Sequence, residues 1–238
     1  MKVILHSDLN NFYASCEQVY DSSLKDRVFC VTGSVKDRHG IVLAKNEKAK
    51  KLGVKTGMTI RDAKNLCPEL LTVEADFDKY LDFSEKVRKI YLGYTDRVEP
   101  FGIDEAWLDV TNSKIFGNGE KIADEIRSKV RDLKLTASVG VSFNKVFAKL
   151  GSDMKKPDAT TVIDENNYKE KVWCLPCSDL LMVGRKTALK LAKFNINTIG
   201  DLANTNVGFL TESFGKWGKM LSAFAKGEDA SSVRKYEE

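Results

Sequence analysis

The sequence contains no long apolar run, and this absence limits where the protein can act. No stretch approaches the roughly 20 apolar residues that a membrane-spanning helix needs. The opening residues, which include Lys2 and Asp8, are too few and too soon charged for a signal peptide. Internal repeats and low-complexity tracts are absent as well. We therefore expect a cytoplasmic protein with no membrane partner.

Cysteine is present in a number and spacing that argue against a disulfide framework. The five cysteines, an odd number, are scattered along a chain that has no signal peptide, so free thiols are expected. Cys174 and Cys177 form a C-x-x-C pattern. A redox motif of this type needs a strand before it and a helix N-terminus beneath it, and a zinc site needs a second cysteine pair. Neither accompanies this pattern, so we predict a structural turn.

The remaining composition is that of an ordinary globular protein, with 42% apolar and 30% charged residues. Its 238 residues suit one large or two to three small domains. Segments 1–27 and 76–165 are net acidic, whereas segments 28–75 and 166–238 are net basic. This segregation suits a metal centre flanked by segments that bind a polyanion, although solvated surface lysines also account for imbalances of this size.

Hydrophobic periodicity predicts strands and helices in a specific order. The predicted elements are a strand (2–7), a helix (10–20), a long amphipathic helix (76–94), a hairpin (97–101 and 106–110), a helix (120–133), a strand (136–142) and a helix (145–154). Strand, helix, strand, strand, helix, strand is the split βαβ order of ferredoxin-like folds. We expect an antiparallel sheet with helices on one face.

Two further segments have a different character, and the fold class is α+β. Residues 28–75 predict a small, basic, mixed subdomain inserted after the first helix. Its elements are strands at 28–32 and 40–43, a polar turn at 33–39 and helices at 44–52 and 59–67. After Pro157, short helices predict an all-α domain. Residues 233–238 contain no clear terminal element, so we expect that the chain is cut at a linker.

Two adjacent carboxylates, Asp104 and Glu105, lie between apolar residues in a strand-like stretch. Neighbouring strand residues point to opposite faces, so both cannot face solvent unless the chain bends. Asp8 ends the first predicted strand, which the split βαβ order brings beside the hairpin. The three carboxylates then meet at one edge of the sheet, where oxygen ligands suit Mg²⁺ or Mn²⁺ and two-metal chemistry. The alternative is an acidic pair on a solvated turn.

Six short motifs, spread over nearly the whole chain, carry a family resemblance. They are residues 7–17 (SDLNNFYASCE), 49–54 (AKKLGV), 98–109 (VEPFGIDEAWLD), 138–145 (SVGVSFNK), 148–150 (AKL) and 153–157 (DMKKP). In this order they resemble the Y-family translesion DNA polymerases, nearest to bacterial DNA polymerase IV and the polymerase V catalytic subunit. Chance agreement of so many separated motifs is negligible.

The resemblance implies a metal-dependent active site. By correspondence of motifs, Asp8, Asp104 and Glu105 would be the catalytic acids and metal ligands, with the backbone carbonyl of Leu9 as a further ligand. Glu105 would be nearest the primer 3′-hydroxyl. The implied cofactor is Mg²⁺, as two ions, with Mn²⁺ as an alternative.

Nucleotide binding is implied for Phe12, Tyr13, Lys50 and Lys156. Tyr13 matches the steric gate, an aromatic ring that packs beneath the incoming sugar and clashes with a ribose 2′-hydroxyl. Phe12 is expected to serve the helix core as well. Lys50 and Lys156 match triphosphate-binding positions, because a polyanion requires cations beyond the metals.

The chain departs from the family pattern close to these positions. Where many relatives have Tyr and Arg, this sequence has Glu47 and Lys50. The change loses a phenol contact and replaces a bidentate donor by a point charge. Asn10 replaces the second Asp of the common D-x-D opening, as in the polymerase V pattern, and leaves the three principal acids intact.

Residues 181–188 resemble a helix-hairpin-helix element, in which a glycine turn and a helix N-terminus present backbone N–H groups to a DNA phosphate. Gly184 would allow close approach, and Arg185 and Lys186 would add charge, so all three are candidate DNA-binding residues. Binding of this kind is independent of sequence and sensitive to salt. The alternative is a plain helical turn.

The function implied is a template-directed translesion DNA polymerase, with primer-template DNA and dNTP as partners. Its palm would comprise residues 1–27 and 76–165, its fingers 28–75 and its thumb 166–238. The little-finger domain and the clamp-binding tail of the family would be absent. We therefore expect weak or no primer extension by the chain itself, and a sliding-clamp partner for the full-length protein.

Two alternative functions fit these residues less well than a polymerase does. A non-catalytic DNA-binding accessory relative would be expected to lose metal acids, and all three are present. A nucleotide cyclase on a similar palm would carry a G-G-[DE]-[DE]-F-type turn, which this sequence lacks.

Overall fold

The computed structural model describes residues 2–33 and 40–237. The predicted polar turn at 33–39 lies outside the described residues except for Gly33. Within the described ranges, no helix is long and apolar enough to cross a membrane. All five cysteines are unpaired, as expected, and Cys174 lies in a turn.

A main sheet with strand order β5-β6-β1-β7-β8 forms the centre of the molecule. Its strands are β1 (Ile4–Leu9), β5 (Val98–Pro100), β6 (Glu105–Asp109), β7 (Ala137–Ser142) and β8 (Thr160–Val162), and its helices are α1 (Phe12–Tyr20), α4 (Phe77–Leu92), α5 (Gly119–Asp132) and α6 (Lys145–Met154). β1 pairs antiparallel with β6 on one side and with β7 on the other. This order confirms the predicted split βαβ arrangement, in which the first strand is central.

The helices of the main sheet begin where the sequence supplies a capping side chain. Asp76 accepts a hydrogen bond from the backbone N–H of Lys79 at the start of α4, and Asn144 accepts one from Phe147 at the start of α6. Asn118 does the same for α5. Such caps satisfy backbone donors that have no partner in the first turn of a helix.

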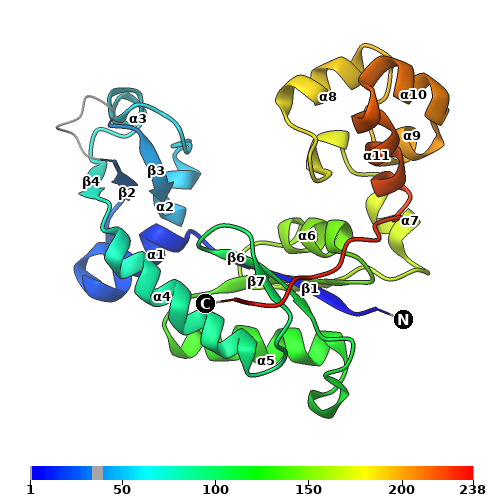
Figure 1. Ribbon diagram of the computed structural model, residues 1–238. Coiled ribbons are helices and arrows are strands. Elements are labelled where there is room, and N and C mark those ends of the chain that lie inside the picture. The colour runs from blue at the N-terminus through cyan, green and yellow to red at the C-terminus, as the bar shows by residue number, and fades with distance from the viewer. Residues whose placement is uncertain (1, 34–39, 238) are drawn as a thin grey trace.

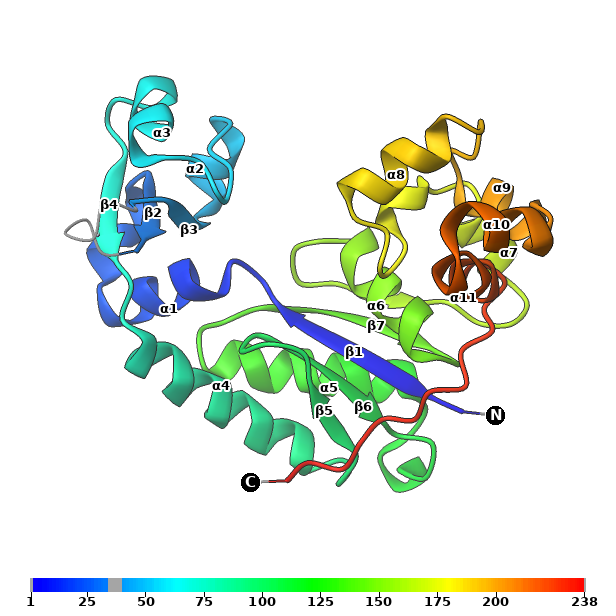
Figure 2. The same cartoon turned by 45° about the horizontal axis from the view of Figure 1, so that its top comes forward.

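Two features of the main sheet differ from the prediction. β8 pairs parallel with β7, so the sheet is mixed rather than antiparallel. Helices cover both faces rather than one, with α4 and α5 on one side and α6 on the other (Figure 2). The reason lies in the strands, because every residue of β1 and of β7 is buried. Strands that are buried on both faces need cover on both.

The approach of α6 to the sheet depends on Gly140 in β7. A Cβ atom at this position would overlap the carbonyl of Ala148 and come within 2.6 Å of the backbone nitrogen of Ser152. Only glycine leaves room for this helix-to-strand distance. The side chains of α6 are thereby brought against the face of β1.

A small-sheet unit is inserted between α1 and α4. It contains β2 (Phe29–Thr32), β3 (Val42–Lys45), β4 (Leu71–Glu74), α2 (Glu47–Lys51) and α3 (Ile60–Leu66), with strand order β3-β2-β4. The predicted helix at 44–52 starts too early, because Ala44 and Lys45 belong to β3 and Asn46 caps α2. β4 was not predicted, and it pairs parallel with β2.

A helical unit follows the main sheet and confirms the predicted all-α region. Its helices are α7 (Tyr168–Val172), α8 (Arg185–Ala192), α9 (Ile199–Asn204), α10 (Val207–Phe214) and α11 (Lys216–Ala225). Their apolar core includes Leu191, Leu202 and Leu210 and extends to Phe147 and Leu150 of α6. In Figure 1 this unit and the small-sheet unit rise from opposite ends of the same side of the main sheet, the side on which α6 lies.

The chain then returns from α11 to the main sheet through residues 228–237, which we call the return segment (Figure 1). Val233 is buried against Trp107, and the backbone N–H of Arg234 donates to Glu99 Oε2 (3.0 Å). Further along, Arg88 of α4 donates to the hydroxyl of Tyr236 (2.8 Å). The return segment is therefore packed onto the sheet.

Candidate functional site

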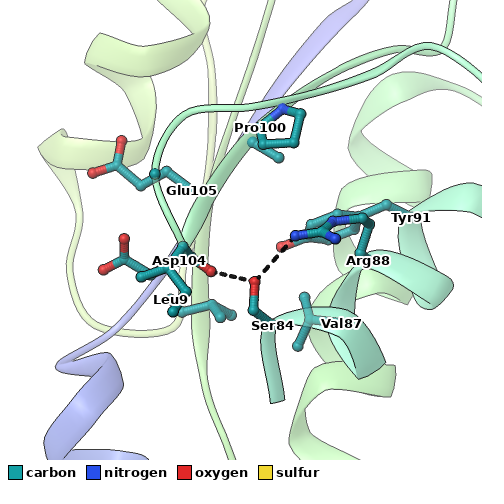
Figure 3. Close-up of a pocket in the computed structure, with 11 residues that line it drawn as sticks. Leu9, Ser84, Val87, Arg88, Tyr91, Pro100, Asp104 and Glu105 are labelled. Carbon is teal, nitrogen blue, oxygen red and sulfur yellow. Dashed lines mark hydrogen bonds between the residues drawn. The ribbon is translucent and has the colours of Figure 1, made fainter. Parts of the chain in front are cut away.

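Strand pairing places three carboxylates at one end of β1 and β6. Asp8 lies directly opposite Glu105, and the backbone N–H of Leu9 donates to the carbonyl of Asp104 (3.0 Å). Gly102, in the loop before β6, has a φ of 88°, which glycine adopts without strain. The chain bends here, and the Asp104 and Glu105 carboxylates point to the same side (Figure 3). We call Asp8, Asp104 and Glu105 the acid cluster.

Asp8 is almost buried and is paired with one lysine. Lys156, just beyond α6, has its Nζ atom 2.7 Å from Asp8 Oδ2 and 2.9 Å from Asp153 Oδ1. Burial raises the pKa of Asp8 to about 6, although the hydrogen bond from Lys156 acts in the opposite direction. A single lysine therefore does not compensate for the desolvation of this carboxylate.

At Glu105, by contrast, the neighbouring polar groups affect the pKa more than burial does. Its Oε2 atom is 2.6 Å from Lys149 Nζ and 3.2 Å from His6 Nε2. Burial favours a higher pKa, but the close approach of His6 Nε2 and the hydrogen bond and charge of Lys149 outweigh it and lower the pKa of Glu105 to about 2. The pKa of Asp104 is raised, first by burial and then by the charge of Glu105. The cluster thus contains one firmly ionised carboxylate and two that favour a further cation.

A small pocket lies beside the turn that carries Asp104, lined in part by α4 (Figure 3). Ser84 Oγ donates to the carbonyl of Ile103 at 2.5 Å, and Arg88 Nη2 donates to Ser84 Oγ at 3.5 Å. These contacts fix the backbone one residue before Asp104.

The acid cluster offers the oxygen donors that Mg²⁺ and Mn²⁺ prefer. As they stand, residues 2–33 and 40–237 include no group of three or more His, Cys, Asp or Glu side chains arranged to hold a metal ion. Two of the three carboxylates instead contact lysines, Asp8 with Lys156 and Glu105 with Lys149. The raised pKa values of Asp8 and Asp104 indicate that the cluster favours more positive charge. In the chemistry of their oxygen donors, these residues fit a divalent ion.

Tyr13 lies at the first turn of α1, within electrostatic reach of the acid cluster. Its ring stacks on Tyr80 with centroids 4.4 Å apart and meets the edge of Phe77. Its pKa is raised by burial and, to a lesser extent, by the charge of Asp104. Phe12 is only 3% exposed and packs in the main core, so its side chain contributes to the fold.

Lys50 is not joined to the acid cluster by any contact among the described residues. It lies on α2, half-exposed, with its Nζ atom 3.5 Å from Glu47 Oε1. The same oxygen accepts a hydrogen bond from Asn11 Nδ2 (2.8 Å), which links α2 to the start of α1. Glu47, the residue that departs from the family pattern, therefore bridges the small-sheet unit and the main sheet.

Gly184, Arg185 and Lys186 lie together at the start of α8, in the helical unit. All three are exposed, and a Cβ at Gly184 would meet nothing within 4 Å. They belong to the helical unit, whereas the acid cluster lies at the end of β1 and β6 in the main sheet, so the predicted DNA-binding residues form a separate feature.

Sequence reasoning missed His6, Ser84 and Lys149. Lys149 belongs to a motif that carries the resemblance, and His6 precedes Asp8 by two residues, which places both on one face of β1. These two signals could have identified them. Ser84 acts on a backbone carbonyl, and nothing in its surrounding sequence indicates this contact.

Comparison with protein families gives two matches. A model of the impB/mucB/samB family matches residues 7–153. A second model, described as the DNA polymerase-iota thumb domain, matches residues 178–229 and includes the start of α8.

Curated relatives extend over nearly all of this chain. It is 58% identical over 236 residues to DNA polymerase IV of Acetivibrio thermocellus and 39% identical over 227 residues to DNA polymerase IV 1 of Bacillus subtilis. The alignments cover 98% and 95% of this chain but 59% and 55% of the relatives. The chain therefore spans a little over half the length of the curated relatives it matches.

Solved structures agree in fold. DinB from Sulfolobus solfataricus superimposes with a TM-score of 0.90 at 29% identity, over 98% of this chain and 69% of that chain. The insertion ternary complex of Dbh DNA polymerase also gives a TM-score of 0.90 at 29% identity, over 97% and 69%. The chain therefore belongs to the impB/mucB/samB family, and the resemblance of its motifs to Y-family DNA polymerases is confirmed.

Proposed function

We propose that the chain is the catalytic part of a translesion DNA polymerase, which adds dNTPs to a primer 3′-hydroxyl as a template directs and releases pyrophosphate. The observation that carries the proposal is the acid cluster, in which Asp8 faces Glu105 across β1 and β6 and Asp104 lies beside them. The curated relatives to which the chain is 58% and 39% identical are named DNA polymerase IV and DNA polymerase IV 1.

Asp8, Asp104 and Glu105, with the backbone carbonyl of Leu9, would hold two Mg²⁺ ions, or Mn²⁺ in their place. Such ions, when bound, lower the pKa of an attacking hydroxyl and stabilise the charge of the leaving group. Glu105, already ionised and held through Oε2, would lie nearest the primer 3′-hydroxyl. Lys156 would exchange its contact with Asp8 for one with the triphosphate, which leaves Asp8 to the metal.

The other nucleotide contacts are assigned to α1 and α2. Tyr13 would limit the space below the sugar, since its ring is held by stacking on Tyr80. Lys50 would reach the triphosphate from the small-sheet unit after release from Glu47. The buried ring of Phe12 leaves its backbone as the part that could contact the nucleotide.

DNA would be held by the units beside the main sheet. We assign residues 1–27 and 76–165 as palm, 28–75 as fingers and 166–238 as thumb, with Gly184, Arg185 and Lys186 contacting the DNA backbone. The proposal includes a cytoplasmic location and, for a protein of the length of its relatives, a sliding-clamp partner. The part of those relatives that this chain does not match would strengthen the grip on DNA.

Primer extension with Mg²⁺ tests the proposal. The chain would be compared with a fusion to the remaining part of the Acetivibrio thermocellus relative, and we expect weak extension by the chain and stronger extension by the fusion. Asp104→Ala should lower the rate by roughly 10³-fold, because it removes a group that stabilises charge in the transition state. Asp109→Asn, at the other end of β6, is the matched control and should retain activity.

Undiminished extension by Asp104→Ala would reject the metal assignment. A chain and a fusion that bind primer-template but never extend it would favour the accessory alternative. Tyr13→Ala should increase ribonucleotide incorporation by the fusion, and unchanged sugar discrimination would reject its role as a gate.

A further inference from the structure

Glu105 is held asymmetrically. The two short polar contacts of its carboxylate, with Lys149 Nζ (2.6 Å) and His6 Nε2 (3.2 Å), both reach Oε2. Within the described residues, Oε1 has no contact of hydrogen-bond length. One oxygen is therefore fixed from inside the protein, and the other is left for a partner in the site.

His6 lies beneath Glu105 on the same face of the sheet. It is two residues before Asp8 in β1, and it is opposite Trp107, two residues after Glu105 in β6. The His6 ring is fully buried and meets the Trp107 ring edge-on at 5.1 Å. Its Nε2 atom makes no aligned hydrogen bond to any residue in the described part of the chain. Glu105 Oε2 is its close polar neighbour, and contacts of this kind often tighten only in the substrate complex.

Ser152 of α6 contacts Nδ1, one of the two ring nitrogens of His6. A neutral imidazole ring has one N–H, so the group that meets Nδ1 decides whether Nε2 carries the proton. Ser152 Oγ is 2.8 Å from His6 Nδ1 and 2.7 Å from the carbonyl of Lys149, and its single proton can go to either. Donation to Nδ1 leaves the N–H on Nε2, facing the carboxylate. Donation to the Lys149 carbonyl would turn a bare nitrogen towards that negative charge, so the first arrangement is favoured.

Lys149 approaches Glu105 from α6 and is itself restrained. Its ammonium group lies 5.6 Å from the centre of the Phe101 ring and 3.7 Å from Asp153 Oδ2, and its side chain is 16% exposed. The helix reaches this position because Gly140 lets it approach the sheet. His6, Lys149 and Ser152 thus form one connected support.

We propose that His6 and Lys149 are positioning residues that hold Glu105 by Oε2, His6 through an Nε2–H whose place on the ring is set by Ser152, so that Oε1 stays aimed at the reacting centre. This inference rests on the proposed function. Partners of this kind orient metal-binding side chains and typically change metal affinity or activity by roughly 10- to 100-fold when they are lost.

The position of the His6 proton can be measured directly. The sequence has two histidines, so ¹⁵N-histidine labelling of the chain gives two sets of ring signals, and the His39→Gln variant assigns them. We expect a protonated Nε2 and an unprotonated Nδ1 for His6. Ser152→Ala should move part of the population to the other tautomer. A proton on Nδ1 in the unsubstituted chain would overturn the proposal.

Kinetics on the whole chain test the role of the support. His6→Phe and Lys149→Met should lower the maximal single-turnover rate of nucleotide incorporation by roughly 10- to 100-fold, with little change in apparent dNTP affinity. His6→Gln and Lys149→Arg keep a donor near Oε2 and should recover most of the rate. Lys145→Met is the matched control, because Lys145 is also on α6 and pairs with Glu99 (2.8 Å) outside the acid cluster. The Lys145→Met variant should be less stable than the unsubstituted chain but should incorporate nucleotide at the same maximal rate.

A measurement of Mn²⁺ binding distinguishes a positioning role of Lys149 from simple competition between its charge and the metal. It does not require the protein to be active. If Lys149 only competes with metal for Glu105, Lys149→Met will bind Mn²⁺ more tightly and keep its rate, which would overturn the proposal. Weaker Mn²⁺ binding and a lower rate support it. A failure of the proposed function has a different signature, since the unsubstituted chain would then not bind Mn²⁺ and neither the chain nor the fusion would incorporate dNTP.

Discussion

The acid cluster and the start of α8 would carry the two functions of the proposed polymerase, but they are built differently. In the cluster, Asp8 is 7% exposed and lies opposite Glu105 on paired strands, and Lys156 and Lys149 hold these two carboxylates. At α8, Arg185 and Lys186 are exposed, and no side-chain partner for either is found within residues 2–33 and 40–237. The side chains of the acid cluster are held in place before any ligand binds, whereas those at the start of α8 can adjust to a ligand.

The difference follows from the work that each region would do. Reaction at a phosphate requires groups held at defined positions, and small displacements are costly. Contacts with a DNA backbone are repeated at every step and carry no sequence information, so mobile charges serve them. The comparison therefore predicts large effects of small changes near the cluster and small, salt-dependent effects at α8.

The largest contrast is expected between two glycines. Gly140→Ala places a methyl group against the backbone of α6 and should lower the free energy of unfolding by about 3 kcal/mol, the upper part of the usual range for overpacking. Gly184→Ala adds a methyl group to open space at the N-cap of α8 and should change it by about 1 kcal/mol or less. Urea unfolding of both variants measures the difference. Equal losses would show that the two regions are equally constrained.

The second contrast is in pH dependence. The pKa of Asp8, raised to about 6 by burial, implies that metal affinity falls about tenfold per pH unit below that value, because the ligand must lose its proton. For the metal-free protein, the stability of the fold depends on pH in the opposite direction. The folded pKa lies above the ordinary value of 3.8, so this group favours folding at low pH and disfavours it as pH rises through 6. Mn²⁺ titration and thermal unfolding between pH 4 and pH 7 check both. A flat metal affinity from pH 7 to pH 5 would contradict this assignment.

A smaller effect is expected from the paired substitution Arg185→Ala and Lys186→Ala. Each lost phosphate contact should reduce the slope of the logarithm of DNA affinity against the logarithm of salt concentration by roughly 1. The maximal incorporation rate at saturating DNA should be unchanged. Fluorescence anisotropy over a salt series measures the slope, and an unaltered slope would remove these residues from the DNA interface.

The smallest effect is expected at the capping box of α9. Thr198 accepts from the backbone N–H of Asp201, and the Asp201 carboxylate accepts from the backbone N–H of Thr198. Thr198→Ala should destabilise the helical unit by about 1 kcal/mol. Mn²⁺ binding to the acid cluster should not change. Loss of metal binding in this variant would show that the two regions are coupled.

Much of the main sheet could be predicted because its signals are local. The α6 bounds match the predicted helix at 145–154, where Asn144 provides the cap. The convergence of Asp8 on Glu105 followed from strand order alone. The prediction of helices on one face failed because two-sided burial of β1 and β7 depends on α6, which no pattern within either strand reveals.

The parts of the site that could not be predicted depend on distant contacts. Ser84 lies in α4 and is separated from Ile103 by the rest of that helix and by β5, so their contact forms only once these elements have packed. β4 was missed because it is a short strand with half-exposed and exposed residues in alternation, completed by pairing with β2. Such features arise from tertiary contacts that outweigh local preference.

The return segment limits the movement of the helical unit. That unit is joined to the main sheet by the chain that follows β8 and by the return segment, where Val233 is buried and Arg234 is held by Glu99. It also shares its apolar core with Phe147 and Leu150 of α6. A movement of α8 relative to the acid cluster would therefore have to disturb a packed core as well as two chain connections.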